Sequence, residues 1–210
     1  FGLSGCDKLN SPKSTNTAAE EQPTQSQPIE QENTSKPSRT LLTRAFTHTP
    51  SFEPWFVRYP EQENLLRDLY EGLTAYDSEG RIVPGIAESW QTKDNKTWIF
   101  TLREGLRWSN GDPLVAQDVM LSWQALSQSN SPLRSYLAYL NLKNAKGVLE
   151  KNKPFKSLGI YAENDRTLRI ELDKPTPYLP EMLAHISLVP QYSDPDSPVT
   201  NGAYMIESEN

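Results

Sequence analysis

The chain has 210 residues, 36% of them hydrophobic and 23% charged, with 17 prolines and a formal net charge of -6. Because phosphate binding needs a basic face, the acidic charge excludes nucleic acid as a main partner. The single cysteine excludes an internal disulfide and a cysteine-based zinc site. No apolar run approaches the ~18–20 residues of a membrane span. The length suits one or two domains, and the polar composition predicts that part of the chain is not packed.

Residues 1–6 read Phe-Gly-Leu-Ser-Gly-Cys and resemble the end of a bacterial lipoprotein signal peptide. Small residues precede Cys6, as the signal peptidase requires, and the Cys6 thiol is the acceptor for a diacylglyceryl group. Because the chain begins with Phe1 rather than Met, we expect the rest of the signal to precede it. Asp7 resembles the signal for retention at the inner membrane. We therefore predict that Cys6 is lipidated, the alternative being a free surface cysteine.

Residues 7–40 are predicted to form a disordered linker. Between residues 10 and 40 the aliphatic side chains are those of Ala18, Ala19 and Ile29. So few apolar groups cannot offset the entropy lost when the chain is ordered. A flexible chain of this length spans roughly 30 Å on average, so it would serve as a tether between Cys6 and a folded part at 41–210.

From residue 41 onward, tryptophan, tyrosine, leucine and isoleucine recur with the periods of helices and strands. The expected helices are residues 62–70, 116–128, 136–142 and 179–183. The expected strands are residues 97–102, 106–108, 158–161, 167–172 and 187–189, with turns at 77–80 and 109–113. Helices and strands are mixed without regular alternation, which predicts the α+β class. Trp98, Phe100 and Trp108 are expected to be buried together.

No set of residues has the spacing of a catalytic or metal site. His48 and His185 lie far apart in sequence, which predicts ordinary structural or surface histidines. Local roles in turns and helix caps are expected for Asp77, Asp94, Asp112 and Asp118. Tryptophans can stack on sugars or bases, but core packing is the expected role of Trp90, Trp98, Trp108 and Trp123. We therefore expect no enzyme activity, no cofactor and no metal.

Five short motifs stand in order between residues 87 and 123. They are Ala-Glu-Ser-Trp at 87–90, Trp-Ile-Phe-Thr-Leu-Arg at 98–103, Trp-Ser-Asn-Gly-Asp-Pro at 108–113, Ala-Gln-Asp-Val at 116–119 and Ser-Trp at 122–123. Together they resemble the family 5 extracellular solute-binding proteins, which are the receptors of dipeptide, oligopeptide and nickel ABC importers. Further matches at 67–73, 175–178 and 200–204 extend the resemblance over about residues 50–206.

This resemblance implies a particular α+β fold, that of a periplasmic binding protein with two lobes around a buried cleft (type II-like, peptide-receptor class). Residues 41–210 would form an incomplete solute-binding domain belonging to its first lobe, with an inserted α+β subdomain at about 71–190. Family members are more than twice as long as this chain, so the second lobe would lie outside these residues.

The resemblance also indicates where a ligand would bind, and the residues there depart from the family pattern. In the oligopeptide receptors, one cleft-lining segment has an acidic residue and a valine whose N–H binds the peptide. Arg58 and Pro60 take these two places, on either side of Tyr59. Pro60 has no N–H to donate, and Leu133 replaces a tyrosine that reaches the peptide. The ligand-binding candidates are therefore Arg58, Tyr59, Pro60 and Leu133.

The expected function is that of a substrate-binding lipoprotein of a peptide-type ABC importer. It would be a monomer, lipid-anchored on the periplasmic side of the inner membrane, and would deliver oligopeptides or related small solutes to the membrane permease. The family also binds dipeptides, nickel complexes, haem and glutathione, and the sequence leaves the ligand open. The alternative is a truncated, membrane-tethered remnant that binds no solute and acts by protein contacts or not at all. In either case we expect the 210 residues alone to bind peptides weakly or not at all.

Overall fold

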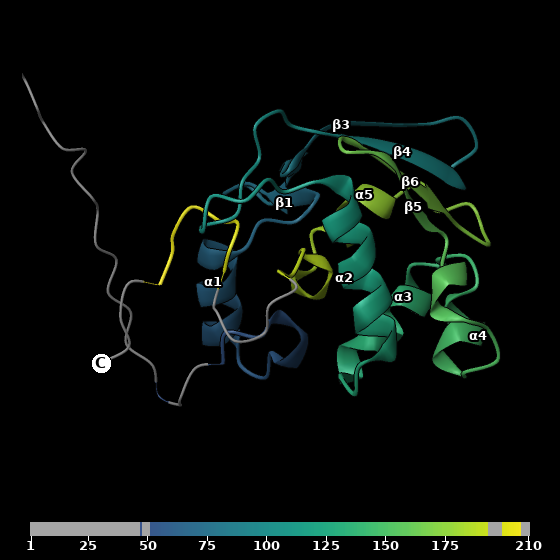
Figure 1. Cartoon of the computed structure of the whole chain (residues 1–210), viewed down its shortest axis with the longest axis horizontal. Helices are drawn as coiled ribbons and strands as arrows, with labels where there is room; N and C mark the ends of the chain where they lie inside the picture. The colour runs from purple at the N-terminus through teal and green to yellow at the C-terminus, as the bar shows by residue number, and fades with distance from the viewer. Residues whose placement is uncertain (1–46, 48–50, 193–198, 207–210) are drawn as a thin grey trace, which may run out of the picture. The chain divides into compact units, whose positions relative to one another are not determined.

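A four-stranded antiparallel sheet, crossed on one face by a long helix, is the largest regular assembly in the described part of the chain (Figure 1). The structure is a computed structural model. It describes residue 47, residues 51–192 and residues 199–206, all within one unit, Thr43–Asn210. Cys6 and the predicted linker at 7–40 lie outside these residues. Among the described helices, none has the length and apolar character needed to cross a membrane.

The strands are β1 (Thr74–Tyr76), β2 (Ile82–Pro84), β3 (Ala87–Thr92), β4 (Thr97–Leu102), β5 (Ile160–Asn164) and β6 (Thr167–Glu171). β1 and β2 form a separate hairpin, and the larger sheet has the order β3-β4-β6-β5 with antiparallel neighbours. The α-helices are α1 (Pro60–Leu69), α2 (Ala116–Gln128), α3 (Tyr136–Tyr139), α4 (Ala145–Leu149) and α5 (Leu179–Leu183). The 3-10 turns are η1 (Pro54–Phe56), η2 (Pro132–Ser135), η3 (Phe155–Ser157) and η4 (Ile186–Leu188).

Most of the buried apolar side chains in the described residues lie in one large cluster around the sheet and α2, which we call the sheet core. Strand β4 alternates, so that Trp98 and Phe100 point into this cluster and are 5% and 0% exposed. Trp108 is 3% exposed in the same cluster, which confirms the predicted burial of these three rings. On α2, the Trp123 indole donates to the carbonyl of Leu188, 2.9 Å away. This bond ties α2 to the chain after α5.

The start of α2 shows how local chemistry fixes an element. Val115 precedes the helix, and its side chain has no atom that could accept a hydrogen bond from the free backbone amides of the first turn. Instead Asp118, in the first turn, accepts from the Val115 N–H at 2.9 Å and from the Trp108 indole at 3.3 Å. The predicted capping role of Asp118 is therefore confirmed, and the same carboxylate also holds a core tryptophan in place.

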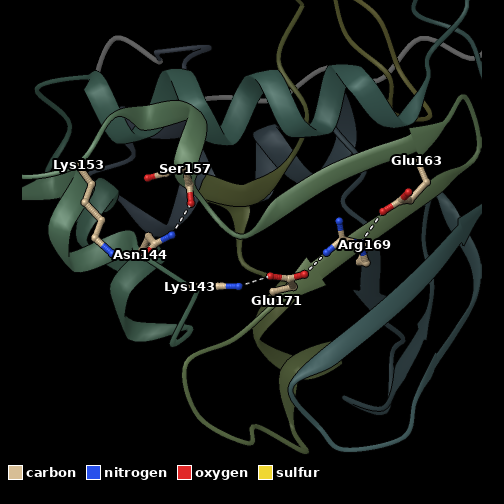
Figure 2. Close-up of polar contacts among 7 residues, drawn as sticks. All are labelled: Lys143, Asn144, Lys153, Ser157, Glu163, Arg169 and Glu171. Carbon is tan, nitrogen blue, oxygen red and sulfur yellow. Dashed lines mark hydrogen bonds and ion pairs between the residues drawn. The ribbon is translucent and has the colours of Figure 1, made fainter.

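The outer face of the sheet carries polar and partly exposed side chains. The Arg169 guanidinium lies 4.0 Å from the centre of the Tyr161 ring on the neighbouring strand. It also pairs with Glu163 and Glu171, and Lys143 reaches Glu171 at 2.7 Å (Figure 2). This chain of charges connects β5, β6 and the segment before α4.

A second, smaller cluster surrounds α1, and we call it the α1 core. Its buried members are Leu66, Leu69, Tyr70, Ile186 and Val189. Burial raises the pKa of Tyr70 to about 12, and the nearby charge of Glu53 adds to the shift.

The chain around residue 201 returns to the end of α1, and its neighbour Val199 is buried in the sheet core. The Asn201 side chain accepts from the N–H of Glu71 at 3.2 Å and donates to its carbonyl at 2.9 Å. The Gly202 N–H donates to the carbonyl of Leu69 at 2.8 Å. A Cβ at Gly202 would lie 2.5 Å from the Leu69 carbonyl carbon, so only glycine fits there.

The α+β class is confirmed, but several predicted elements differ. Residues 187–189 were expected to be a strand; they belong instead to the turn η4 and the residue after it, because the His185 ring accepts the Ser187 N–H and starts a 3-10 turn. The expected strand at 106–108 is only an isolated bridge between Arg107 and Pro113. The helix expected at 136–142 ends at Tyr139. The hairpin β1–β2, strand β3 and helix α4 were not predicted.

Candidate ligand-binding face

Arg58, Tyr59 and Pro60 lie exposed at the start of α1. Pro60 is the first residue of the helix, where a missing N–H costs nothing because first-turn amides have no partner within the helix. The Gln62 side chain accepts from the N–H groups of Arg58 and Tyr59, at 3.0 and 3.3 Å. This segment therefore offers a ligand its side chains, because its backbone donors are already occupied.

Leu133 lies half-buried in η2, on the neighbouring segment. Ser131, which precedes η2, accepts from the Leu133 N–H at 3.0 Å and donates to the carbonyl of Trp55 in η1. The turns η1 and η2 are thus packed together, although they are more than 70 residues apart in sequence. The structure brings the segments that carry the four predicted ligand-binding candidates side by side.

Next to η2, three aromatic rings form a shelf that the sequence did not reveal. The ring of Tyr136 stacks on that of His185, with centroids 4.1 Å apart and planes 20° apart. The Tyr139 ring lies 5.5 Å from that of Tyr136 and is 70% exposed. The Tyr136 hydroxyl donates to the carbonyl of Met182, so its ring is fixed against α5. We call Tyr136, Tyr139 and His185 the aromatic shelf.

Burial disfavours the charged forms of two of the three rings of the aromatic shelf. Burial lowers the pKa of His185 below its usual value, with the charges of Glu63 and Arg67 acting in opposite directions. Burial also raises the pKa of Tyr136. Arg67 pairs with Glu63 at 2.6 Å and donates to the carbonyl of Ala184. Neutral rings bordered by arginines can stack on planar or apolar groups and pair with carboxylates.

The prediction for His185 was that of an ordinary structural or surface histidine. The structure agrees with a structural role, since its Nδ1 accepts from the Ser187 N–H, and adds the stacking on Tyr136. The spacing of Tyr136 and Tyr139, three residues apart in a predicted helix, was the one available signal. Within the described residues, no group of three His, Cys, Asp or Glu side chains could hold a metal ion.

Comparison with known proteins places the chain in a family. Residues 81–210 match the model of the bacterial extracellular solute-binding proteins, family 5. A Haemophilus influenzae protein, whose name says only that it is a binding protein, is 54% identical over the whole chain and 39% of its own length. The periplasmic oligopeptide-binding protein OppA of Salmonella typhimurium is 37% identical over 81% of the chain and 34% of its own length.

A solved structure shows the same fold. Haemophilus influenzae OppA in complex with the peptide RPPGFSPFR superposes with a TM-score of 0.73 and 36% identity, over 77% of this chain and 34% of that chain. This chain therefore spans between a third and two fifths of the length of these three relatives. The resemblance seen in the sequence is confirmed: the chain belongs to the bacterial extracellular solute-binding proteins of family 5.

Proposed function

We propose that the protein is the solute-binding component of a peptide-type ABC importer and that it captures oligopeptides or related small solutes in the periplasm. The observation that carries this proposal is the match to a peptide-bound OppA over 77% of the chain. Because the chain covers about a third of that protein, we take residues 47–206 as one wall of the binding site. A permease in the inner membrane would receive the solute.

We further propose that the ligand contacts the face formed by Arg58, Tyr59, Leu133 and the aromatic shelf. Gln62 occupies the backbone donors at residues 58 and 59, so recognition on this wall would rely on side chains. The exposed Arg58 guanidinium favours a carboxylate or an acidic side chain of the ligand. Tyr139, 70% exposed, offers a ring face to an apolar or planar side chain.

The anchor is a separate part of the proposal. Leu3-Ser4-Gly5-Cys6 would carry the lipid, residues 7–40 would be the tether, and the folded part would remain at the periplasmic face of the membrane as a monomer. Globomycin blocks the lipoprotein signal peptidase, so treated cells of the native host should accumulate the unprocessed precursor. Unchanged processing would exclude lipidation at Cys6.

Native mass spectrometry of the gene product, purified from its host, tests the capture of solutes. We expect added masses that fragment into peptides of a few residues. An added mass of a nickel complex, haem or glutathione would identify a different ligand, and the protein would still be a solute-binding protein. Protein that carries no ligand, and that also ignores a mixed tri- to pentapeptide library in calorimetry, would favour the tethered remnant.

The face itself is tested by substitution in that gene product. Tyr139→Ala and Arg58→Ala should each weaken ligand binding, by about tenfold if one stacking contact or one charged hydrogen bond is lost. Arg107→Ala is the matched control, since the Arg107 guanidinium donates to the carbonyl of Gly111 within its own turn. If Tyr139→Ala and Arg58→Ala bind the ligand as tightly as Arg107→Ala does, the ligand does not contact this face.

A further inference from the structure

The lysines of the protein are gathered at one end of the sheet. The described residues contain eight lysines, and all lie on three segments there: the β3–β4 turn, the stretch around α4 and the chain after β6 (Figure 1). We call this group the lysine end; it comprises Lys93, Lys96, Lys143, Lys146, Lys151, Lys153, Lys156 and Lys174. All except the half-buried Lys96 are exposed.

Hydrogen bonds between the three segments hold these lysines together. The Leu172 N–H donates to the carbonyl of Lys96 at 2.8 Å, and the Lys143 N–H donates to that of Glu171 at 2.9 Å. The Lys153 ammonium donates to the side chain of Asn144, next to Lys143 (Figure 2). The group is therefore a fixed surface of the fold.

The lysine end is positive in a chain that is negative overall. Segments 93–96, 143–156 and 171–174 contain the eight lysines and only four carboxylates, whereas the whole chain has a net charge of -6. Two of the carboxylates face a lysine: Glu171 meets Lys143 at 2.7 Å, and Glu150 meets Lys146 at 3.9 Å. Within the described residues, Lys151 and Lys156 form no ion pair, so their charges face solvent.

Arginines are used differently. Of the eight arginines in the described residues, five form ion pairs with carboxylates; these are Arg67, Arg81, Arg103, Arg166 and Arg169. A guanidinium suits such fixed, directional pairs, whereas a lysine ammonium is a compact, hydrated charge on a flexible stem. The lysine end therefore suits a diffuse negative surface, where no single partner has to be positioned.

We propose that the lysine end docks on the anionic phospholipid headgroups of the membrane that holds Cys6. The proposal rests on the proposed lipid anchor, which would keep the domain within the tether's reach of roughly 30 Å and so raise its local concentration at the bilayer. Each lysine near an anionic bilayer strengthens binding by about fivefold, and the attraction acts only within a Debye length of about 10 Å. The lipid on Cys6 and the lysine end would then contact the membrane at two places, and together they would fix the orientation of the domain.

Vesicle co-sedimentation of the 210-residue chain, produced without its lipid and kept reduced, tests this surface independently of peptide capture and of anchoring. We expect binding to vesicles that contain 40% phosphatidylglycerol in phosphatidylcholine and little binding to phosphatidylcholine alone. Raising NaCl from 50 to 500 mM should release the protein. Equal binding to both vesicles, or to neither, would overturn the proposal while leaving the proposed capture function intact.

Two matched variants locate the contact. K151Q/K156Q removes two exposed lysines and should weaken binding to the anionic vesicles by about 20-fold. R81Q/R107Q removes the same number of positive charges away from the lysine end and should change binding by less than about twofold. K151R/K156R should bind like the parent chain, and thermal melts check that every variant is folded.

Other outcomes would also decide the matter. If R81Q/R107Q weakens binding as much as K151Q/K156Q, the attraction is one of net charge and the lysine end has no special part. If the chain ignores protein-free anionic vesicles but binds vesicles that carry the permease, the lysine end recognises an acidic protein surface and the lipid proposal is wrong.

Discussion

The two cores of the protein are built in different ways. The sheet core is built around the regular strands and α2, with further side chains from α3, α4 and α5, and rings as large as those of Phe100 and Trp123 are at most 1% exposed. The α1 core has five buried residues, on α1 with the residue after it and on the irregular segment 186–189, and partly buried side chains such as Leu65 border it. Since burial of apolar surface is the main favourable term in folding, we expect the sheet core to provide most of the stability.

The difference also shows in what holds each core in place. Backbone ladders between neighbouring strands hold the sheet core, and their register is set by alternating side chains. The α1 core instead depends on single contacts between distant residues, such as those of Asn201 and Gly202 with the end of α1. Regular structure is thus robust to the loss of one polar group, whereas the α1 core is sensitive to it.

The largest effect is expected in the sheet core. Trp98→Ala should lower the free energy of unfolding by about 3–5 kcal/mol, because it leaves a large cavity beside Phe100. The Trp98 indole N–H is buried and has no partner among the described residues. Trp98→Phe should therefore cost less than its loss of volume suggests, since it also removes an unpaired donor. Urea denaturation measures both.

Trp90→Ala is the control for this prediction. Trp90 lies half-buried on the edge strand β3 and stacks at 6.0 Å from Phe100. Its removal should cost less than half as much as that of Trp98. A larger cost for Trp90 would show that the edge of the sheet, rather than its centre, limits stability.

The next effect is expected in the α1 core. Leu66→Ala should cost about 2–3 kcal/mol, the lower part of the range for such changes, because a small cluster with half-exposed neighbours can relax into the space. Denaturation followed by both circular dichroism and tryptophan fluorescence would measure the change. A cost above that of Trp98→Ala would reverse the ranking of the two cores.

A smaller effect is expected where the two regions meet. Asn201→Ala removes both hydrogen bonds to the backbone of Glu71 and should cost about 1–2 kcal/mol. Asn110→Ala, in the exposed turn at 109–113, also removes local side-chain bonds and should cost less. Equal thermal shifts for the two variants would mean that the contact at Asn201 is not a special link.

The smallest effect concerns pH. Burial lowers the pKa of His185 in the folded chain, so the unfolded chain binds its proton more readily. Stability should therefore fall as pH drops below about 6.5, the usual histidine pKa. His185→Asn keeps an acceptor for the Ser187 N–H and removes the titration. Its free energy of unfolding should change less between pH 7.5 and 5.5; an unchanged profile would assign the pH dependence to other groups.

The sequence predicted the sheet core better than the α1 core, for physical reasons. Alternation at 97–102 and the apolar stripe at 116–128 located β4 and α2 with the observed bounds, because both patterns are local. Residues 187–189 are as apolar as a strand, but the cap from His185 and the Pro190 that follows turn the chain away. No local pattern predicts that a side chain will accept a hydrogen bond in this way.

The candidate face was predicted only in part. The family resemblance pointed to Arg58, Tyr59, Pro60 and Leu133, and the structure packs their two segments together. The stacking of Tyr136 on His185 joins residues 49 positions apart, and neither belongs to a motif. Such a contact depends on the tertiary fold, so no periodic pattern in the sequence predicts it.

The contact between Glu71 and Asn201 brings together the two ends of the segment that forms the sheet region, which bears on whether that segment can be exchanged. Residues 72–200 leave the α1 region and return to it at nearly the same place, because the Asn201 side chain bonds both backbone groups of Glu71. A segment whose ends lie together can be moved between hosts or have its ends joined with little strain. An exchange of the sheet region among relatives would therefore have to keep Ile186 and Val189, because these residues lie within 72–200 and complete the α1 core.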